Sequence, residues 1–261
     1  MLGNDVVDLA DVDARPETFR RRFDERVFTE EERRALADDP SPHPLRWAHW
    51  AAKEAAYKCL RQGDPRFVFS PIRLEARFEP AERASSSALF PFAASGAAWT
   101  RRGALRVVDD ERLLERAASR PGPVELELRA FATPELVHVV AQPAGRDGSD
   151  VTLAVETLAD SVEEASLAVR RLARREAARL LAVQPARVTI GRRGRIPILE
   201  LDGVERPVAL SLSHHGRFIA CALAPCRATR DGGARGATKP VLTVGSVGNP
   251  TSGRDAKRRA G

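Results

Sequence analysis

The sequence predicts an α+β protein made of two halves of similar size and content. Each half contains helical segments, and in the long helix of the second half apolar residues recur at three- and four-residue steps. Each half also contains short apolar-rich segments bounded by turn residues, which are typical of antiparallel strands. Residues 142–150, with two glycines and one proline, form a linker between the halves. We therefore expect one lobe over residues 1–150 and a second over residues 151–226, each a small antiparallel sheet packed with helices.

The first lobe begins with a short strand and continues with three helices. Thr29 and Glu32 fit a capping box that opens the second helix. Three prolines, beginning at Pro40, predict a loop between the second and third helices, and Gly63 ends the third. The strand is expected over residues 3–9 and the helices over residues 16–27, 29–36 and 45–61.

The remaining elements are mostly short strands. Residues 79–123 predict variable connections around one or two strands, and Thr133-Pro134 predicts the turn of a hairpin. In the second lobe, a long arginine-rich helix over residues 161–181 precedes a basic glycine loop over residues 191–196. The other strands are expected near residues 72–78, 124–131, 135–141, 151–156, 188–190, 208–213 and 218–223.

The positive charge of the chain lies in its C-terminal segment. The 261 residues carry a formal net charge of +6. Residues 227–261 contain eight basic and two acidic residues, so this segment alone accounts for +6 and residues 1–226 balance to zero. The segment is rich in Gly, Thr, Ser and Pro and has no aromatic residue, which predicts a disordered basic tail. A nucleic-acid-binding protein that acts through this tail is therefore a disfavoured interpretation.

Three features predict a cytoplasmic protein. No apolar run approaches the roughly 20 residues needed to cross a membrane. The N-terminus shows no basic region followed by an apolar segment, so no signal peptide is expected. The three cysteines, Cys59, Cys221 and Cys226, have the spacing of neither a disulfide framework nor a zinc site, which favours a reducing compartment.

The alanine-rich segment from Trp50 to Lys58 is the most specific motif of the chain. Glu54 and Lys58 are four residues apart, so their side chains meet on one helix face, and Lys53 lies at the edge of that face. One carboxylate between two ammonium groups suits a metal-bound polyphosphate, because the carboxylate can hold the metal and the lysines can meet phosphate oxygens. The alternative is a solvated ion pair on a helix surface.

Two further segments carry residues suited to such a site. Asp5 lies between a glycine turn and a Val-Val pair, where an aspartate is costly unless something binds it, and a metal ion is the natural compensation. Together with Glu54 it would make a hard-oxygen site that suits magnesium. Ser213 and His214 lie at a strand tip, where they can hold a phosphate. The alternatives are a strand-end aspartate and a plain hairpin turn.

Together these segments resemble the 4'-phosphopantetheinyl transferase superfamily. Its signatures are a Gly-x-Asp strand, a Trp-x-x-Lys-Glu-Ala-x-x-Lys helix, a Ser-x-Ser-His turn and a Phe-Thr-x-x-Glu segment. Their order here is similar to that of the short holo-acyl-carrier-protein synthases, whereas the length is similar to that of the larger, two-lobed members. The signatures stand at residues 3–5, 50–58, 211–214 and 28–32, and the resemblance covers about residues 1–78 and 165–224.

The resemblance implies two fused, pseudo-symmetric lobes with the site between them, in a monomer. It implies the transfer of phosphopantetheine from coenzyme A to a serine of an acyl or peptidyl carrier protein. Asp5 and Glu54 would hold Mg²⁺, with Glu54 or a water that it orients as general base and Lys58 on the phosphate under attack. Val7 stands where larger members often carry a second acid. Contacts to coenzyme A are expected from Lys53, Arg174, Arg175, Arg195, Ser213 and His214.

A carrier protein would dock on the first helix. Arg20, Arg21 and Arg22, with Phe23, offer a basic and apolar face to the acidic helix of such a partner. The alternative function is a non-catalytic module of the same fold that binds coenzyme A or a carrier protein.

Overall fold

The structure of the chain is a computed structural model. Within the described residues it is an α+β fold of helices and antiparallel sheets, as the sequence predicts. The tail predicted over residues 227–261 lies outside the described residues. None of the described helices is long and apolar enough to cross a membrane. The described residues are 1–18, 21–83, 99–108, 124–146, 150–158 and 164–226.

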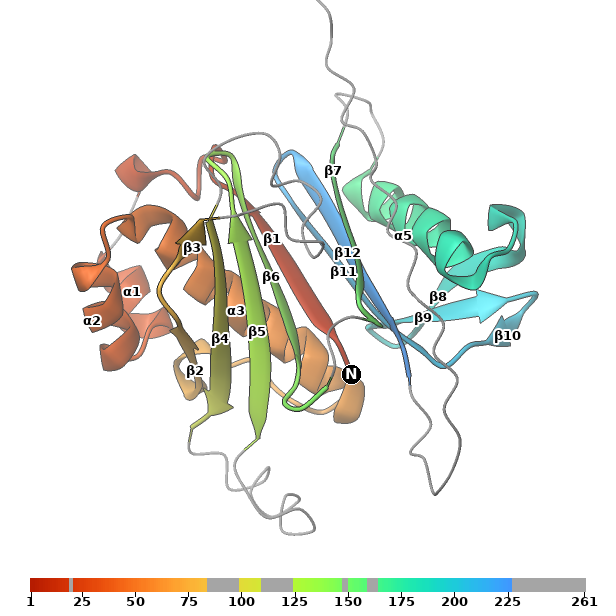
Figure 1. Ribbon diagram of the computed structural model, residues 1–261, viewed down its shortest axis with the longest axis horizontal. Coiled ribbons are helices and arrows are strands. Elements are labelled where there is room, and N and C mark those ends of the chain that lie inside the picture. Colours follow the sequence, from red (N-terminus) through yellow and green to blue (C-terminus); the bar gives the residue numbers. More distant parts are fainter. Residues whose placement is uncertain (19–20, 84–98, 109–123, 147–149, 159–163, 227–261) are drawn as a thin grey trace, which may run out of the picture.

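An antiparallel sheet of six strands forms the larger part of the fold (Figure 1). Its strands follow the order β1-β6-β5-β4-β2, and β3 also pairs with β4. β1 pairs only with β6 among the described strands, so it forms one edge of the sheet. The strands are β1 (Gly3–Asp8), β2 (Leu74–Phe78), β3 (Glu82–Arg83), β4 (Trp99–Val107), β5 (Glu125–Ala132) and β6 (Leu136–Pro143).

Helix α3 (Pro42–Gly63) covers one face of this sheet and packs on β1 and β6. Its buried face consists mainly of alanines, which let the helix backbone approach the strands closely. The approach is tightest at Gly3, where a Cβ atom would lie 1.8 Å from the carbonyl oxygen of Ala55. β1 is therefore held directly against the helical turn that carries Glu54.

The helices before and within this part follow local signals in the sequence, with one exception. The predicted capping box is confirmed, because Thr29 and Glu32 exchange hydrogen bonds at the start of α2 (Glu30–Asp38). The expected start of the third helix at Leu45 is wrong, because α3 already begins at Pro42. Proline is tolerated in a first helical turn, whose N–H groups have no partner within the helix. Also present are α1 (Arg21–Val27) and the short 3-10 turns η1 (Pro16–Thr18) and η2 (Pro71–Arg73).

The described residues from Thr152 onward build two three-stranded antiparallel sheets and one long helix. One sheet has the order β11-β12-β7 and packs against α5, and the other has the order β10-β9-β8. The basic loop expected over residues 191–196 is instead the tip of the β8–β9 hairpin, which turns at Gly194 with φ +61°. The elements are β7 (Thr152–Thr157), α5 (Ala165–Leu181), η5 (Pro185–Arg187), β8 (Val188–Arg193), β9 (Ile196–Leu201), β10 (Val204–Glu205), β11 (Val208–His215) and β12 (Phe218–Pro225).

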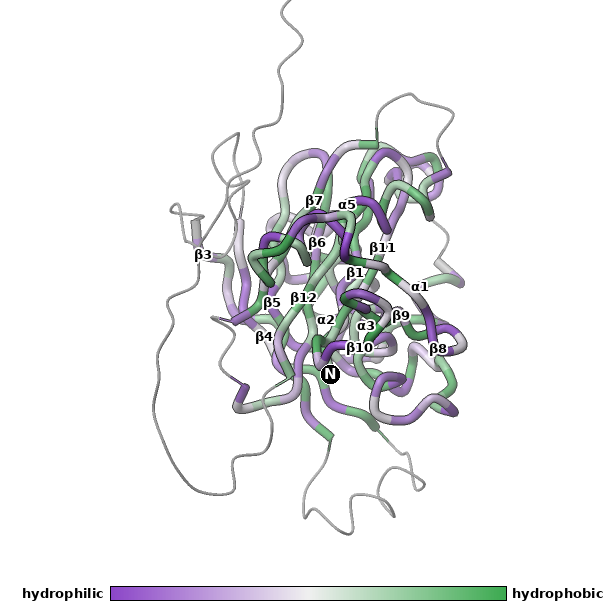
Figure 2. The backbone as a smooth tube through the Cα atoms, turned by 90° about the vertical axis from the view of Figure 1, so that its right-hand side faces the viewer, coloured by the Kyte–Doolittle hydropathy of each residue, from purple (hydrophilic) through white to green (hydrophobic). Residues whose placement is uncertain are grey.

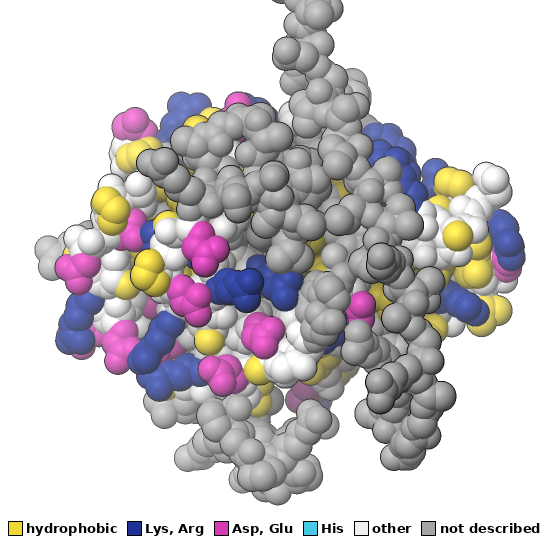
Figure 3. All heavy atoms as spheres, viewed as in Figure 1, with side chains coloured by type: hydrophobic (Ala, Val, Ile, Leu, Met, Phe, Trp, Pro, Cys, Tyr) yellow, Lys and Arg dark blue, Asp and Glu magenta, His cyan; other side chains and the backbone are white. Residues whose placement is uncertain are grey.

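The two parts meet in the middle of the molecule, where β1 contacts β11 and β12 (Figure 1). Apolar side chains from both sides fill this joint, among them Val6, Phe131, Val155 and Phe218. The tube in Figure 2 shows that hydrophobic and hydrophilic residues occur throughout both parts of the chain. In Figure 3, acidic and basic side chains are interspersed over the six-stranded sheet and the helices beside it, in keeping with the balanced charge of residues 1–226.

Candidate active site

One stripe of α3 carries the candidate catalytic side chains. Trp50, Glu54, Tyr57, Lys58 and Arg61 follow one another at steps of one helical turn or less, so they share one face of the helix. The opposite, alanine-rich face is buried against β1 and β6. The stripe therefore lies outside this buried face, and three of its members, Tyr57, Lys58 and Arg61, line a pocket.

Asp5 and Lys58 are in direct contact. The Lys58 Nζ atom donates to Asp5 Oδ1 over 2.7 Å and to the Asn4 carbonyl oxygen over 3.0 Å. Asp5 is 8 % exposed, and Ser213 Oγ also donates to its Oδ1 atom over 2.7 Å. Strand β1, helix α3 and strand β11 thus converge on one carboxylate.

Glu54 is the second carboxylate at this place. Its partial burial raises its pKa, the negative charge of Asp5 raises it further, and the Lys58 ammonium opposes both effects. Asp5 and Glu54 are therefore close enough to repel each other. No hydrogen bond from a described residue reaches the Glu54 carboxylate or the Asp5 Oδ2 atom. Each of the two carboxylates thus has at least one oxygen atom that accepts no hydrogen bond from the described part of the chain.

These carboxylates fit a divalent cation that shares its coordination with a phosphate. Mg²⁺ usually takes one or two protein carboxylates and completes its shell with water and substrate oxygens. A cation would also relieve the repulsion that raises the pKa of Glu54. Val7 adds no ligand, because it is buried in the core under α3. The described residues contain no group of three or more His, Cys, Asp or Glu side chains that could hold a metal alone.

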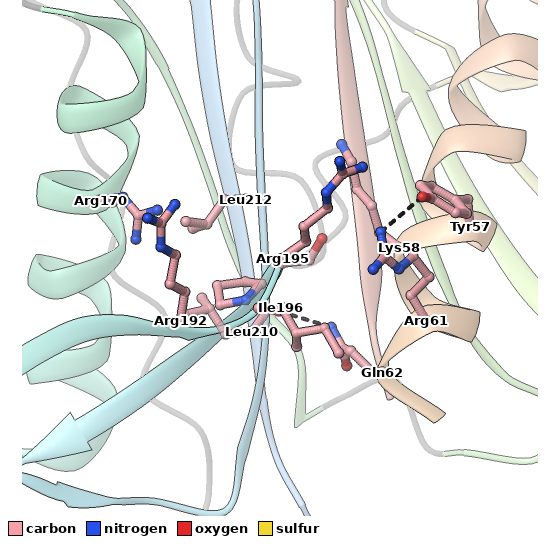
Figure 4. A pocket seen from close by; sticks show the side chains of 13 residues that line it. Tyr57, Lys58, Arg61, Gln62, Arg170, Arg192, Arg195, Ile196, Leu210 and Leu212 are labelled. Atoms are coloured by element: carbon pink, nitrogen blue, oxygen red, sulfur yellow. Dashed lines mark hydrogen bonds between the residues drawn. The ribbon is translucent and has the colours of Figure 1, made fainter. Parts of the chain in front are cut away.

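The pocket lies between α3 and the second part of the chain, with a volume of about 420 Å³ (Figure 4). Its apolar wall comes from β9 and β11 and includes Ile196, Pro197, Leu210 and Leu212. Gln62 closes one end, since its amide donates to the carbonyl oxygens of Leu2 and Leu210 over 2.7 and 2.9 Å. A ligand in this pocket would touch both halves of the protein at once.

The charged side chains that line the pocket are all basic. They are Lys58, Arg61, Arg170, Arg192 and Arg195, from α3, α5 and the β8–β9 hairpin. Arg192 and Arg195 are exposed and form no hydrogen bond or ion pair with the described residues. Because cations without acidic partners attract anions, the pocket is suited to a ligand that carries several negative charges.

Lys53 is not part of this pocket. Its side chain is fully buried, and its Nζ atom pairs with Glu32 over 2.7 Å and donates to the carbonyl oxygens of Pro71 and Leu74. The expected contact between Lys53 and coenzyme A is wrong, because successive residues of a helix point about 100° apart and Lys53 therefore faces the core. The Phe-Thr-x-x-Glu segment supplies its partner, Glu32.

The arginine that α5 contributes to the pocket is Arg170, not Arg174 or Arg175. Arg170 lies one helical turn before Arg174 and donates to the Ile190 carbonyl oxygen over 3.3 Å. Arg174 is exposed outside the pocket lining, and Arg175 forms ion pairs with Glu156 and Glu176. Arg195 lines the pocket as expected. Tyr57, Arg61, Gln62 and Arg192 also line it and were missed, although Tyr57 and Arg61 follow Glu54 at helical spacing.

Ser213 and His214 of the Ser-His turn do not line the pocket, although both were expected to contact coenzyme A. Ser213 is 5 % exposed and is absent from the pocket lining, because its hydroxyl is engaged with β1. His214 is exposed and also lies outside the pocket lining. Ser211 does contribute to the lining, although its hydroxyl accepts a hydrogen bond from the Asn4 N–H group.

Comparison with protein families addresses the first part of the chain. Residues 1–104 match the family model of the 4'-phosphopantetheinyl transferase superfamily. The resemblance seen in the motifs is thereby confirmed over residues 1–104, and the superfamily that this region matches is one of transferases. The matched region contains Asp5, Glu54 and Lys58. A search of the curated proteins finds no match.

Proposed function

We propose that the protein transfers 4'-phosphopantetheine from coenzyme A to a serine hydroxyl of an acyl or peptidyl carrier protein, with Mg²⁺ as cofactor. One observation carries the proposal: among the described residues, the pocket is lined by five basic side chains and no acidic one, and one of them, Lys58, pairs with Asp5 and acts through its charge on Glu54. Coenzyme A carries a pyrophosphate and a 3'-phosphate and therefore has the charge that this lining suits.

The pocket lining would bind the donor. Arg170 and Arg192, which lie on the side of the pocket away from α3, are suited to the 3'-phosphate. Arg61, Lys58 and Arg195, whose side chain extends toward α3, are suited to the pyrophosphate. The apolar wall around Leu210 and Leu212 suits the less polar parts of the molecule.

Asp5 and Glu54 are the residues that would hold Mg²⁺. The metal would neutralise charge on the pyrophosphate as the leaving group departs. Asp5 offers Oδ2 for this purpose, because Oδ1 already accepts hydrogen bonds from Lys58 and Ser213.

In the reaction, the oxygen of the carrier serine forms a bond to the β-phosphorus. The bond between that phosphorus and the bridging oxygen breaks, and adenosine 3',5'-bisphosphate leaves with the electron pair. Glu54, or a water that it orients, takes the proton of the serine hydroxyl, and its raised pKa makes it a stronger base than an ordinary glutamate. Lys58 stabilises the negative charge on the phosphate under attack.

The carrier protein would dock on α1. Arg22 is exposed on this helix, whereas Arg20 and the Arg21 side chain lie outside the described residues. Phe23 is not free to dock, because its ring packs against Phe28, Trp47 and Trp50. We therefore assign the docking to the basic residues of α1. Since both walls of the pocket come from one chain, we expect a monomer to be sufficient for activity. We expect this monomer to be cytoplasmic.

Incubation of the full chain with coenzyme A, Mg²⁺ and a panel of apo carrier proteins tests the proposal by mass spectrometry. Transfer adds about 340 Da to the carrier, the mass of the phosphopantetheine group moved in such a phosphoryl-type transfer. Coenzyme A binding without a mass gain on any carrier would instead favour the non-catalytic module. Salt-sensitive DNA binding that requires residues 227–261, again without transfer, would favour a nucleic-acid-binding protein.

A further inference from the structure

The outer edge of β1 is satisfied by side chains rather than by another strand. The N–H groups of Asn4, Val6 and Asp8 point away from β6, and an edge strand leaves such groups without ladder partners. They donate instead to side chains of β11: to Ser211 Oγ over 2.9 Å, Ser213 Oγ over 3.2 Å and His215 Nδ1 over 3.2 Å. The alternation of a strand places these three acceptors on one face of β11.

Ser213 differs from Ser211 in one respect. Both hydroxyls accept a hydrogen bond from β1, but the Ser213 hydroxyl also donates its single proton to Asp5 Oδ1 over 2.7 Å. No hydrogen bond joins Ser211 to a carboxylate among the described residues. Ser213 therefore couples the joint between the two halves to the orientation of the Asp5 carboxylate.

The geometry points to Ser213 as a positioning residue that holds Asp5 Oδ1 and so leaves Oδ2 turned toward a cation shared with Glu54. This role rests on the proposed function, but it concerns how the protein prepares the metal site rather than which group is transferred. It also departs from the phosphate contact expected for Ser213, because the hydroxyl is buried and already has an acceptor and a donor partner. Residues of this kind around a metal ligand typically contribute about 10- to 100-fold to metal affinity.

Calorimetric titration of the full chain with Mn²⁺, in the absence of coenzyme A and carrier protein, tests the role of Ser213. We expect Ser213→Ala to raise the dissociation constant of Mn²⁺ at least about tenfold, and Ser211→Ala to change it by less than about threefold. Both variants lose one buried partner of a β1 N–H group, so both should lose similar thermal stability. Ser213→Thr, which retains the hydroxyl, should recover most of the metal affinity.

Three outcomes would overturn the role: unchanged Mn²⁺ affinity in Ser213→Ala, an equal loss in both alanine variants, or no Mn²⁺ binding by the unmodified protein. Calorimetry with coenzyme A alone adds a second readout, in which Ser213→Ala should bind like the unmodified protein. A weaker affinity there would make Ser213 a phosphate contact instead. Because none of these measurements needs turnover, they remain decisive even if no carrier protein is modified.

Discussion

Lys58 and Asp5 form an ion pair that joins the long helix to the first strand, with 2.7 Å between Nζ and Oδ1. Lys58 is 28 % exposed at its side chain and Asp5 11 %, so the pair is largely shielded from water. The same ammonium opposes the rise in the pKa of Glu54 that burial and Asp5 cause. The Lys58 ammonium group therefore offsets part of the negative charge of both Asp5 and Glu54 without a bound ligand.

Replacing Lys58 with methionine removes this charge and keeps most of the side-chain volume. We expect kcat to fall at least about 100-fold, the usual loss when one group that stabilises transition-state charge is removed. Lys58→Arg keeps the charge and should retain more activity than Lys58→Met. Steady-state kinetics with one apo carrier protein measures both variants, and normal turnover by Lys58→Met would exclude Lys58 from the reaction.

Replacing Glu54 with glutamine should separate activity from stability. A carboxyl whose pKa is raised on folding destabilises the folded state once it is ionised. Glu54→Gln should therefore abolish turnover while raising the free energy of unfolding at pH 7 by roughly 0.5–2 kcal/mol, the range seen when a functional strain is removed. Urea unfolding and the carrier mass assay provide the two readouts.

The pH dependence of the free energy of unfolding provides a control for the expected stabilisation by Glu54→Gln. The cost of the ionised Glu54 is fully present above its folded pKa, and it disappears below the unfolded value of about 4.3, where the carboxyl is protonated in both states. The stability difference between Glu54→Gln and the unmodified protein should therefore shrink as the pH falls from 7 to 4. An active variant would remove Glu54 from the mechanism.

Arg192 and Arg193 are neighbours on β8 with different surroundings. Arg192 lines the pocket, whereas Arg193 forms an exposed ion pair with Glu205. We expect Arg192→Ala to raise the KM for coenzyme A about tenfold, as the loss of a hydrogen bond to a charged group does, and Arg193→Ala to change it little. The effect of Arg192→Ala should diminish at high salt, where charge is screened. Equal KM values for both variants would exclude Arg192 from donor binding.

Much of the first part of the fold could be predicted because its signals are local. The capping box at Thr29 and the helical spacing of Glu54 and Lys58 depend only on residues within one or two turns. The start of α3 was misjudged because proline acts as a helix breaker only inside a helix and not in its first turn. Local sequence signals therefore predict which side chains share the face of α3 that carries Glu54 and Lys58, but they do not determine where the helix begins.

The roles of Ser213 and Arg174 could not be predicted from the sequence, because they depend on which segments meet in space. Nothing near Ser213 in the sequence shows that its hydroxyl faces the edge of β1, 208 residues away from Asp5. Likewise, Arg170 and Arg174 share one face of α5, and only the position of the β8–β9 hairpin brings Arg170 to the pocket. The spacing of residues in the sequence therefore predicts which side chains share a helix face, but tertiary packing decides which of them lines the pocket.

Lys53 should affect stability rather than coenzyme A binding. Lys53→Met leaves the Glu32 carboxylate buried without its cation, and breaking a buried pair in this way typically costs about 3–5 kcal/mol. We expect the melting temperature to fall by roughly 10 °C. The KM for coenzyme A should stay the same below the melting transition, and a large rise in KM with unchanged stability would contradict the structural role of this pair.

Asp8 and Arg217 form an ion pair between the C-terminal end of β1 and the turn that joins β11 to β12. Burial alone would raise the pKa of Asp8, but hydrogen bonds from the side chain and backbone of Arg217 and from the Ala10 N–H group lower it to about 2. Asp8→Asn should therefore lower the free energy of unfolding at pH 7 by about 1–2 kcal/mol. Urea unfolding at several pH values measures the difference.

The sign of its pH dependence follows from the depressed pKa. The stability that ionised Asp8 contributes is complete above the unfolded value of about 3.9 and is lost as the pH falls toward 2. The gap between Asp8→Asn and the unmodified protein should thus be constant from pH 7 to about 5 and narrow below pH 4. Asp202→Asn is the matched control, because Asp202 also pairs with an arginine, Arg187, but on the exposed surface. It should change stability little at any pH, and an effect as large as that of Asp8→Asn would show that the buried joint contributes nothing beyond a surface ion pair.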